Sequence, residues 1–257
     1  MTWLHAIVLG VVEGVTEFLP VSSTGHLILA ADLLGLKETE FLKSFEIAIQ
    51  MGAILAVVAS AWRRFFRERA VLLRVIVAFL PTAVIGLALY GVIKKHLLGN
   101  ELVVVWALVL GGLALLAFEK FNTPPKHAKT DLSKMSYKDA VLIGLSQALA
   151  IIPGTSRSAS TILGGMALGW SRAAIVEFSF LLAVPTMAAA TGLDLLKSGF
   201  AFSTDEYGLL AIGFATAYVV ASAAVKWFLA YVRTNDFAGF GFYRIFAAFA
   251  FWWFILR

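Results

Sequence analysis

Six long apolar stretches dominate the sequence, and each could cross a lipid bilayer as one helix. A spanning helix needs about 20 mostly apolar residues. Hydrophobic residues make up 60% of the chain and charged residues only 14%, too few to cover a water-soluble domain. The sequence predicts an all-α, polytopic membrane protein that forms a single integral membrane domain over 1–257. The predicted spans are 45–62, 71–93, 101–119, 173–196, 206–231 and 240–256.

Composition narrows the function classes further. The chain has no cysteine, which excludes disulfides, thiolate catalysis and cysteine-ligated metals. Its net charge is +5, but basic residues of a membrane protein concentrate in cytoplasmic loops. We therefore expect membrane lipids, and no nucleic acid, among the partners.

Two further apolar stretches, 3–36 and 138–171, are interrupted by polar segments rich in proline, glycine and hydroxyl residues. The interruptions are Leu19–His26 and Ile152–Ser158. Each leaves about 12–16 apolar residues on either side, too few to span singly. This pattern predicts two re-entrant helix pairs, whose non-helical backbone is tolerated only inside protein or beside a wet cavity.

The two interrupted stretches resemble each other. Gly10-x-x-Glu13 matches Gly144-x-x-Gln147 at an offset of 134 positions. Pro20-x-Ser22-Ser23 matches Pro153-x-Thr155-Ser156 at an offset of 133, which suggests one deleted residue. The match predicts an internal repeat.

Each repeat would contain a re-entrant pair followed by three spans, over about 1–120 and about 137–257. Three spans are an odd number, so the second repeat would enter from the opposite face, giving an inverted-topology repeat. The segments 63–74 and 120–138 each carry five arginine or lysine residues, which places both in the cytoplasm. Both chain termini and the first re-entrant pair would then face the outside.

Ionisable and hydroxyl groups gather in the first interrupted stretch. Glu13 and Glu17 are four positions apart and share one helix face. His26 follows Ser22 by four positions and Ser23 by three, so the three residues share one helix face if the next helix begins at the break. Such groups are costly inside a membrane, so they indicate a functional site, although helix capping and interhelical hydrogen bonds would also explain them. The hydroxyl residues of this break are Ser22, Ser23 and Thr24.

The second interrupted stretch has the character of an anion-binding site. A helix start presents free N–H groups and a positive dipole end, and Arg157 adds a planar fork that fits two phosphate oxygens. Pairing of Arg157 with Glu13 or Glu17 is the structural alternative. Because an inverted repeat brings both breaks together, we expect a substrate with an anionic head and an apolar tail. The candidate binding hydroxyls are Thr155, Ser156, Ser158 and Thr161.

These two segments are similar to the signature motifs of the undecaprenyl-diphosphate phosphatases, the bacitracin-resistance membrane family. The resemblance rests on Glu13-Gly-Val-Thr-Glu17-Phe-Leu-Pro-Val-Ser-Ser-Thr-Gly-His26 and on Pro153-Gly-Thr-Ser-Arg-Ser-Ala-Ser-Thr161, and it covers essentially the whole chain. It implies hydrolysis of undecaprenyl diphosphate to undecaprenyl phosphate and inorganic phosphate. That reaction recycles the lipid carrier of peptidoglycan synthesis and confers bacitracin resistance.

The resemblance also implies a divalent cation, Mg²⁺ or Ca²⁺, and suggests a homodimer. It implies a bacterial cell (inner) membrane location, with the site open to the periplasmic or outer face. In the mechanism that we expect, Arg157 with Ser156 and Ser158 binds phosphate oxygens, and Glu13 and Glu17 hold the cation.

The nucleophile stays open at this point. A water or Ser23 attacks with His26 as base, Ser22 substitutes if the register differs, or His26 itself becomes phosphorylated. The rival function is a prenyl-phosphate flippase or exchanger, because inverted repeats with broken helices are also a transporter architecture. A protein that only binds lipid head groups is the third possibility.

Overall fold

The computed structural model describes residues 1–97, 100–122, 127–198 and 203–257. Within these residues the chain forms ten α-helices, and the only strand-like pairing there is an isolated bridge between Lys129 and Trp170. The all-α expectation is confirmed. The helices are α1 (Trp3–Thr16), α2 (Ser23–Leu33), α3 (Glu40–Arg67), α4 (Arg69–His96), α5 (Glu101–Phe121), α6 (Tyr137–Ala148), α7 (Arg157–Ala167), α8 (Arg172–Ser198), α9 (Thr204–Tyr231) and α10 (Ala238–Phe251).

Six of the described helices are long and apolar enough to cross a membrane: α3, α4, α5, α8, α9, and α10 with the π-helical turn Trp252–Leu256 that continues it. Each predicted span lies inside one of them. The chain is therefore a multi-pass membrane protein, as its hydropathy predicts.

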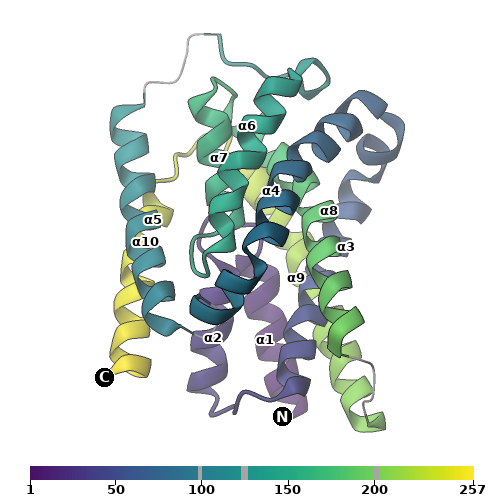
Figure 1. The fold of residues 1–257 in the computed structure, drawn as a ribbon, viewed down its shortest axis with the longest axis vertical. Coiled ribbons are helices and arrows are strands. Elements are labelled where there is room, and N and C mark those ends of the chain that lie inside the picture. Colours follow the sequence, from purple (N-terminus) through teal and green to yellow (C-terminus); the bar gives the residue numbers. More distant parts are fainter. Residues whose placement is uncertain (98–99, 123–126, 199–202) are drawn as a thin grey trace.

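The four short helices form two pairs that occupy opposite ends of the molecule. Figure 1 shows α1 and α2 in the lower half beside both termini, and α6 and α7 in the upper half. The first pair is broken at 17–22. The second pair is broken at 152–156, after a 3₁₀ turn at Leu149–Ile151. Both breaks face the middle of the molecule, so the two polar segments meet there (Figure 1).

The two pairs correspond at a constant offset of 134 positions. Helices α1 and α6 begin at Trp3 and Tyr137, and α2 and α7 begin at Ser23 and Arg157. The residue before each second helix, Ser22 or Ser156, has the same unusual φ of 74°. The one-residue deletion inferred from the two prolines is therefore wrong, because the backbone aligns Ser22 with Ser156 without a gap.

The pairs pack across the two halves of the chain. Helix α1 packs along α9 of the second half, and α6 packs along α4 of the first half. Helices α5 and α10, the last long helix of each half, also lie side by side (Figure 1). Close approach is possible because small residues line these seams: a Cβ on Gly144 of α6 would lie 2.0 Å from the Ala78 carbonyl oxygen of α4.

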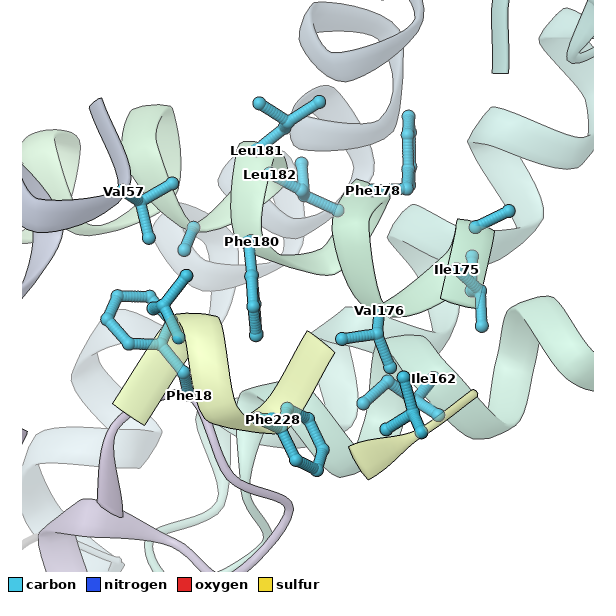
Figure 2. Close-up of a cluster of buried hydrophobic side chains, with 14 of the residues drawn as sticks. Phe18, Val57, Ile162, Ile175, Val176, Phe178, Phe180, Leu181, Leu182 and Phe228 are labelled. Carbon is cyan, nitrogen blue, oxygen red and sulfur yellow. The ribbon is translucent and has the colours of Figure 1, made fainter. Parts of the chain in front are cut away.

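An apolar cluster packs against the first break. Figure 2 shows Phe18 of that break near Phe180 of α8 and Phe228 of α9. The Phe18 and Phe180 rings meet edge to face at 5.1 Å, and the Phe180 and Phe228 ring centres are 6.1 Å apart. Such aromatic contacts immobilise the backbone of the break, which a helix no longer holds.

Candidate active site at the two helix breaks

Both helix starts at the breaks are strained in the same way. Ser22 and Ser156 are the only non-glycine residues with positive φ in the described part of the chain. This conformation costs about 1–3 kcal/mol per residue and is concentrated at functional sites. The first N–H groups of α2 and α7 have no intrahelical acceptor, so both helix starts offer donors beside the breaks.

Glu17 joins the two breaks. Its Oε2 accepts a hydrogen bond from Ser23 Oγ at 2.5 Å, and its Oε1 accepts one from Arg157 Nη2 at 2.9 Å. The side chains of Glu17 and Arg157 are only 5% and 9% exposed. The structural pairing considered from the sequence is thus present, and the carboxylate also contacts a hydroxyl.

Arg157 retains free donor capacity beyond this pair. Its Nη1 donates to the backbone oxygen of Ser179 at 2.9 Å, and its Nε has no hydrogen-bond partner. The guanidinium carbon lies 5.8 Å from the centre of the Phe18 ring, a cation–π contact. Arg157 is therefore held in place and still has an unused N–H group for an anion.

Glu13 is fully buried one turn before Glu17, and neither of its carboxylate oxygens has a hydrogen-bond partner. A buried carboxylate without a partner is costly, and in native proteins it calls for an explanation. No group of three or more His, Cys, Asp or Glu side chains suited to a metal occurs among the described residues. A cation here would therefore have two carboxylates as protein ligands, Glu13 and Glu17.

The ring nitrogens of His26 do not hydrogen-bond to Ser23 in the structure, although both residues are on one turn of α2. Its Nδ1 lies 2.8 Å from the Ser22 carbonyl oxygen, and its Nε2 lies 2.8 Å from the hydroxyl of Tyr243 on α10. A carbonyl oxygen only accepts, so Nδ1 carries the proton. In the neutral ring Nε2 then accepts from Tyr243, and the two rings stack at 5.4 Å. The hydrogen-bond partner of Ser23 is Glu17, which is not the base expected from the sequence.

The remaining predicted hydroxyl residues divide into two groups. Ser158 donates to the Phe18 carbonyl oxygen at 2.8 Å, and Thr161 donates to the Arg157 carbonyl oxygen at 3.0 Å, so both hold backbone of the site. Ser156 caps α7 by accepting from Ala159 N at 3.2 Å. The Ser22 side chain makes no capping bond, and Thr24 is exposed.

Three residues of the site were missed from the sequence: Ser179, Tyr243 and Arg244. Arg244 is completely buried on α10, and it donates to backbone carbonyls of both breaks, including Pro20 and Thr155. The sequence does contain a signal for Arg244, because a charged residue inside the predicted span 240–256 indicates a functional or structural role. We expect no such signal for Ser179 or Tyr243, which are common residue types in apolar helices.

Together these groups form a polar site inside an apolar bundle. The site has a hydroxyl on a carboxylate, an arginine with a free donor, and two helix starts that favour anions. This combination defines a class: a multi-pass membrane protein able to bind and react with an anionic group.

Comparison with known proteins assigns the family. The model of the family described as "Bacitracin resistance protein BacA" matches residues 6–250, and the chain belongs to this family. An undecaprenyl-diphosphatase of Aquifex aeolicus is 50% identical over 245 residues, which cover 95% of each chain. That of Wolinella succinogenes is 48% identical with the same coverage, and that of Bdellovibrio bacteriovorus is 47% identical over 95% of this chain and 93% of its own.

The Glu17 bridge predicts different effects on stability for substitutions of the two glutamates. Glu17→Gln leaves one acceptor oxygen for two donors, so it should lower the free energy of unfolding by about 3 kcal/mol, as breaking a buried pair does. Glu13→Gln changes a buried carboxyl group whose oxygens have no hydrogen-bond partner, so it should be neutral or stabilising. Thermal unfolding in detergent without divalent cations measures both. Equal destabilisation by the two variants would contradict the assigned hydrogen bonds.

Proposed function

We propose that this chain hydrolyses undecaprenyl diphosphate to undecaprenyl phosphate and inorganic phosphate, and so recycles a lipid carrier of peptidoglycan synthesis. The family and the relatives named undecaprenyl-diphosphatase support this activity over nearly the whole chain. The structural observation that best supports this activity is that the Glu17 carboxylate accepts hydrogen bonds from both Ser23 and Arg157. An enzyme for this membrane-embedded diphosphate would give bacitracin resistance, as the family description says.

In the proposed reaction Ser23 is the nucleophile and Glu17 is its base. Ser23 Oγ attacks the distal phosphorus, its proton passes to Glu17, and the bond to the bridging oxygen breaks to release undecaprenyl phosphate. Glu17 then gives this proton to solvent. A water molecule then attacks the phosphoserine phosphorus and passes a proton to Glu17. The bond from phosphorus to Ser23 Oγ breaks, Glu17 returns that proton to Ser23 Oγ, and inorganic phosphate leaves. The 2.5 Å contact between Ser23 and Glu17 supports this assignment over His26, whose nitrogens face Ser22 and Tyr243.

The anion-binding groups complete the mechanism. Arg157 and the N–H groups at the starts of α2 and α7 are assigned to the phosphoryl oxygens, where negative charge builds up in the transition state. Ser156, Ser158 and Thr155 shape this region through the start of α7. Every side chain named here comes from one copy of the chain, so the proposal does not require the homodimer. The flippase alternative gains no support from the three relatives described above, each of which is named undecaprenyl-diphosphatase.

Phosphate release by purified protein in detergent micelles tests this function. Wild-type protein should release inorganic phosphate from undecaprenyl diphosphate, and Ser23→Ala and Glu17→Gln should each lower kcat by about 1,000-fold or more. Arg157→Lys should lose about 100-fold, because lysine cannot reproduce the guanidinium fork. Ser222→Ala is the control, since that hydroxyl only donates to Tyr218 O within α9.

Rapid quenching with substrate labelled in the distal phosphate identifies the nucleophile. A phosphoserine that is absent from Ser23→Ala is the expected result. An acid-labile phosphoenzyme that persists in Ser23→Ala would reassign the nucleophile to His26. No release of phosphate by wild-type protein would refute the proposed activity and favour a transporter or binding protein.

A divalent cation is the proposed cofactor, and the open oxygens of Glu13 fit it. Mg²⁺ in particular is bound through one or two carboxylates together with substrate phosphates, and it supplies charge neutralisation for phosphoryl transfer. The ligands in this chain would be Glu13 and Glu17. Ca²⁺ usually takes six to eight oxygen ligands and would rely more on substrate and water.

Thermal unfolding tests the cation without reference to activity. Mg²⁺ should raise the Tm of wild-type protein, with a concentration dependence that follows binding to the folded state. Glu13→Gln should lose most of this stabilisation. The control is Glu68→Gln, because Glu68 lies in the α3–α4 connection and is 45% exposed. Equal Tm shifts in Glu13→Gln and wild type would remove Glu13 from the cation site.

We further propose that each short helix pair is re-entrant and that the halves form an inverted-topology repeat. Figure 1 shows α1 and α2 at the end that holds both termini, and the α3–α4 and α5–α6 connections at the other end. The basic segments 63–74 and 120–138 comprise those connections and the adjoining helix ends, so the positive-inside rule makes that end cytoplasmic. The first pair and its exposed Thr24 then face the outer side, the periplasm in a cell with two membranes.

Thiol labelling tests this orientation, because the chain has no cysteine of its own. Thr24→Cys should react with a charged, impermeant reagent outside right-side-out vesicles, and diphosphate should slow the reaction. Lys134→Cys, in the α5–α6 connection, is the control and should react only in inverted vesicles. Labelling of Thr24→Cys only in inverted vesicles would refute the orientation. Substrate-protected labelling from both sides would favour alternating access.

A further inference from the structure

Arg244 uses all five of its N–H donors on backbone carbonyl groups. The side chain is completely buried, and no carboxylate of the described residues lies within ion-pair distance of it. A buried charge without a counter-ion is costly unless dipoles replace its hydration, and five carbonyls do so here. The acceptors are Leu108 O at 3.3 Å from Nε, Pro20 O at 3.2 Å and Thr155 O at 3.0 Å from Nη1, and Ala107 O and Gly154 O at 2.9 Å from Nη2.

These carbonyls come from both breaks. Pro20 belongs to the first break, and Gly154 and Thr155 belong to the second. Pro20 and Gly154 are also equivalent, since they are separated by the same 134 positions as the helix starts. One guanidinium therefore ties matching points of the two breaks to α10 and, through the other two carbonyls, to α5.

Holding a carbonyl also fixes the direction of the next N–H group. In a trans peptide unit the C=O and the following N–H point in opposite directions. When Arg244 holds the Thr155 oxygen, the N–H of Ser156 points away from Arg244, at the start of α7. A peptide unit free to rotate could instead present its carbonyl oxygen to the phosphate site, where it would repel an anion.

We propose that Arg244 is a positioning residue for anion binding. It holds the Thr155 carbonyl oxygen toward itself, so the N–H of Ser156 is kept at the start of α7 beside Arg157. The Pro20 and Gly154 carbonyls that it also holds fix the two breaks relative to each other. The inference rests on the proposed function for its substrate, but anion binding can be measured without hydrolysis. Lysine has three donors for five carbonyls, so the conservative change Arg244→Lys leaves at least two of them without a side-chain donor.

Gly111 of α5 offers a second way to disturb the same contact. A Cβ at Gly111 would lie 2.1 Å from Nη2 of Arg244 and 2.6 Å from its Cζ, so Gly111→Ala must displace the guanidinium while the arginine is kept. Gly91→Ala is the matched control, because a Cβ there meets nothing within 4 Å. For the arginine the control is Arg74→Lys, since Arg74 also donates to backbone carbonyls, those of Met135 and Ala70, away from the breaks.

The experiment measures inorganic diphosphate binding by calorimetry and the KM for undecaprenyl diphosphate, both on monodisperse protein in detergent. Arg244→Lys and Gly111→Ala should each weaken diphosphate binding and raise KM by about tenfold or more, the loss expected for hydrogen bonds to a charged group. The two controls should change both quantities less than twofold. These readouts do not depend on the fraction of protein that is folded, so reduced stability alone would not alter them.

Several results would overturn the proposal. Unchanged diphosphate affinity and KM in either folded variant would make Arg244 a packing residue only. An equal loss in Arg74→Lys would make the effect a general one. If Arg244→Lys does not fold, the Gly111→Ala variant provides the test. If neither variant folds, the contact is required for folding and not specifically for anion binding. If wild-type protein binds diphosphate but does not hydrolyse the lipid, the proposed function fails and the binding comparison still tests Arg244.

Discussion

Backbone that is buried but not helical must find hydrogen-bond partners inside the protein, and this requirement organises the centre of the molecule. Apolar helices cannot supply these partners, because their own peptide groups are already paired. The breaks are instead held by a few polar side chains. Arg244 holds carbonyls of both breaks, and Ser158 holds the carbonyl of Phe18. The groups that make the fold possible therefore lie directly beside the groups assigned to chemistry.

The two halves share a backbone plan but carry different side chains at equivalent positions. Ser23 of the first half corresponds to Arg157 of the second, and Glu13 corresponds to Gln147. Gln147 is satisfied, since its amide donates to Thr82 at 2.9 Å and to Thr186 at 3.1 Å. Glu13, by contrast, has no such partner.

The divergence gives each half a separate role. The first half supplies the carboxylates and the hydroxyl, and the second supplies the guanidinium. Because Glu17 and Arg157 pair between the halves, neither half contains the site alone. Packing reinforces this dependence, since α1 lies along α9 and α6 lies along α4.

Much of this arrangement could be predicted from the sequence, because hydropathy and helix-breaking residues act locally. The six spans and the two interrupted stretches follow from such patterns. The alignment of the breaks could not be predicted in the same way. The prolines at 20 and 153 suggested a gap, whereas the shared φ of Ser22 and Ser156 shows none.

Contacts between distant segments were also beyond local patterns. Spacing placed His26 near Ser23, but the ring turns to Tyr243, which lies 217 positions away in sequence. The charge of Arg244 is visible in the sequence, yet its partners are backbone atoms, which carry no residue-specific signal.

The charges at the site bear on the proposal that Glu13 holds a divalent cation. Fully ionised, Glu13 and Glu17 outnumber Arg157, and the charge of Arg244 is already surrounded by carbonyl dipoles. With both carboxylates ionised, a diphosphate approaching this set would meet a net negative group in a medium of low dielectric constant, where repulsion is strong. The proposed divalent cation on Glu13 would reverse the balance, because it would add two positive charges beside the phosphate. In the second half glutamine takes the equivalent place, and its amide is satisfied by two threonines. If the proposed cation is bound at Glu13, the exchange of glutamate for glutamine between the halves would separate a cation ligand from a group that holds two helices together.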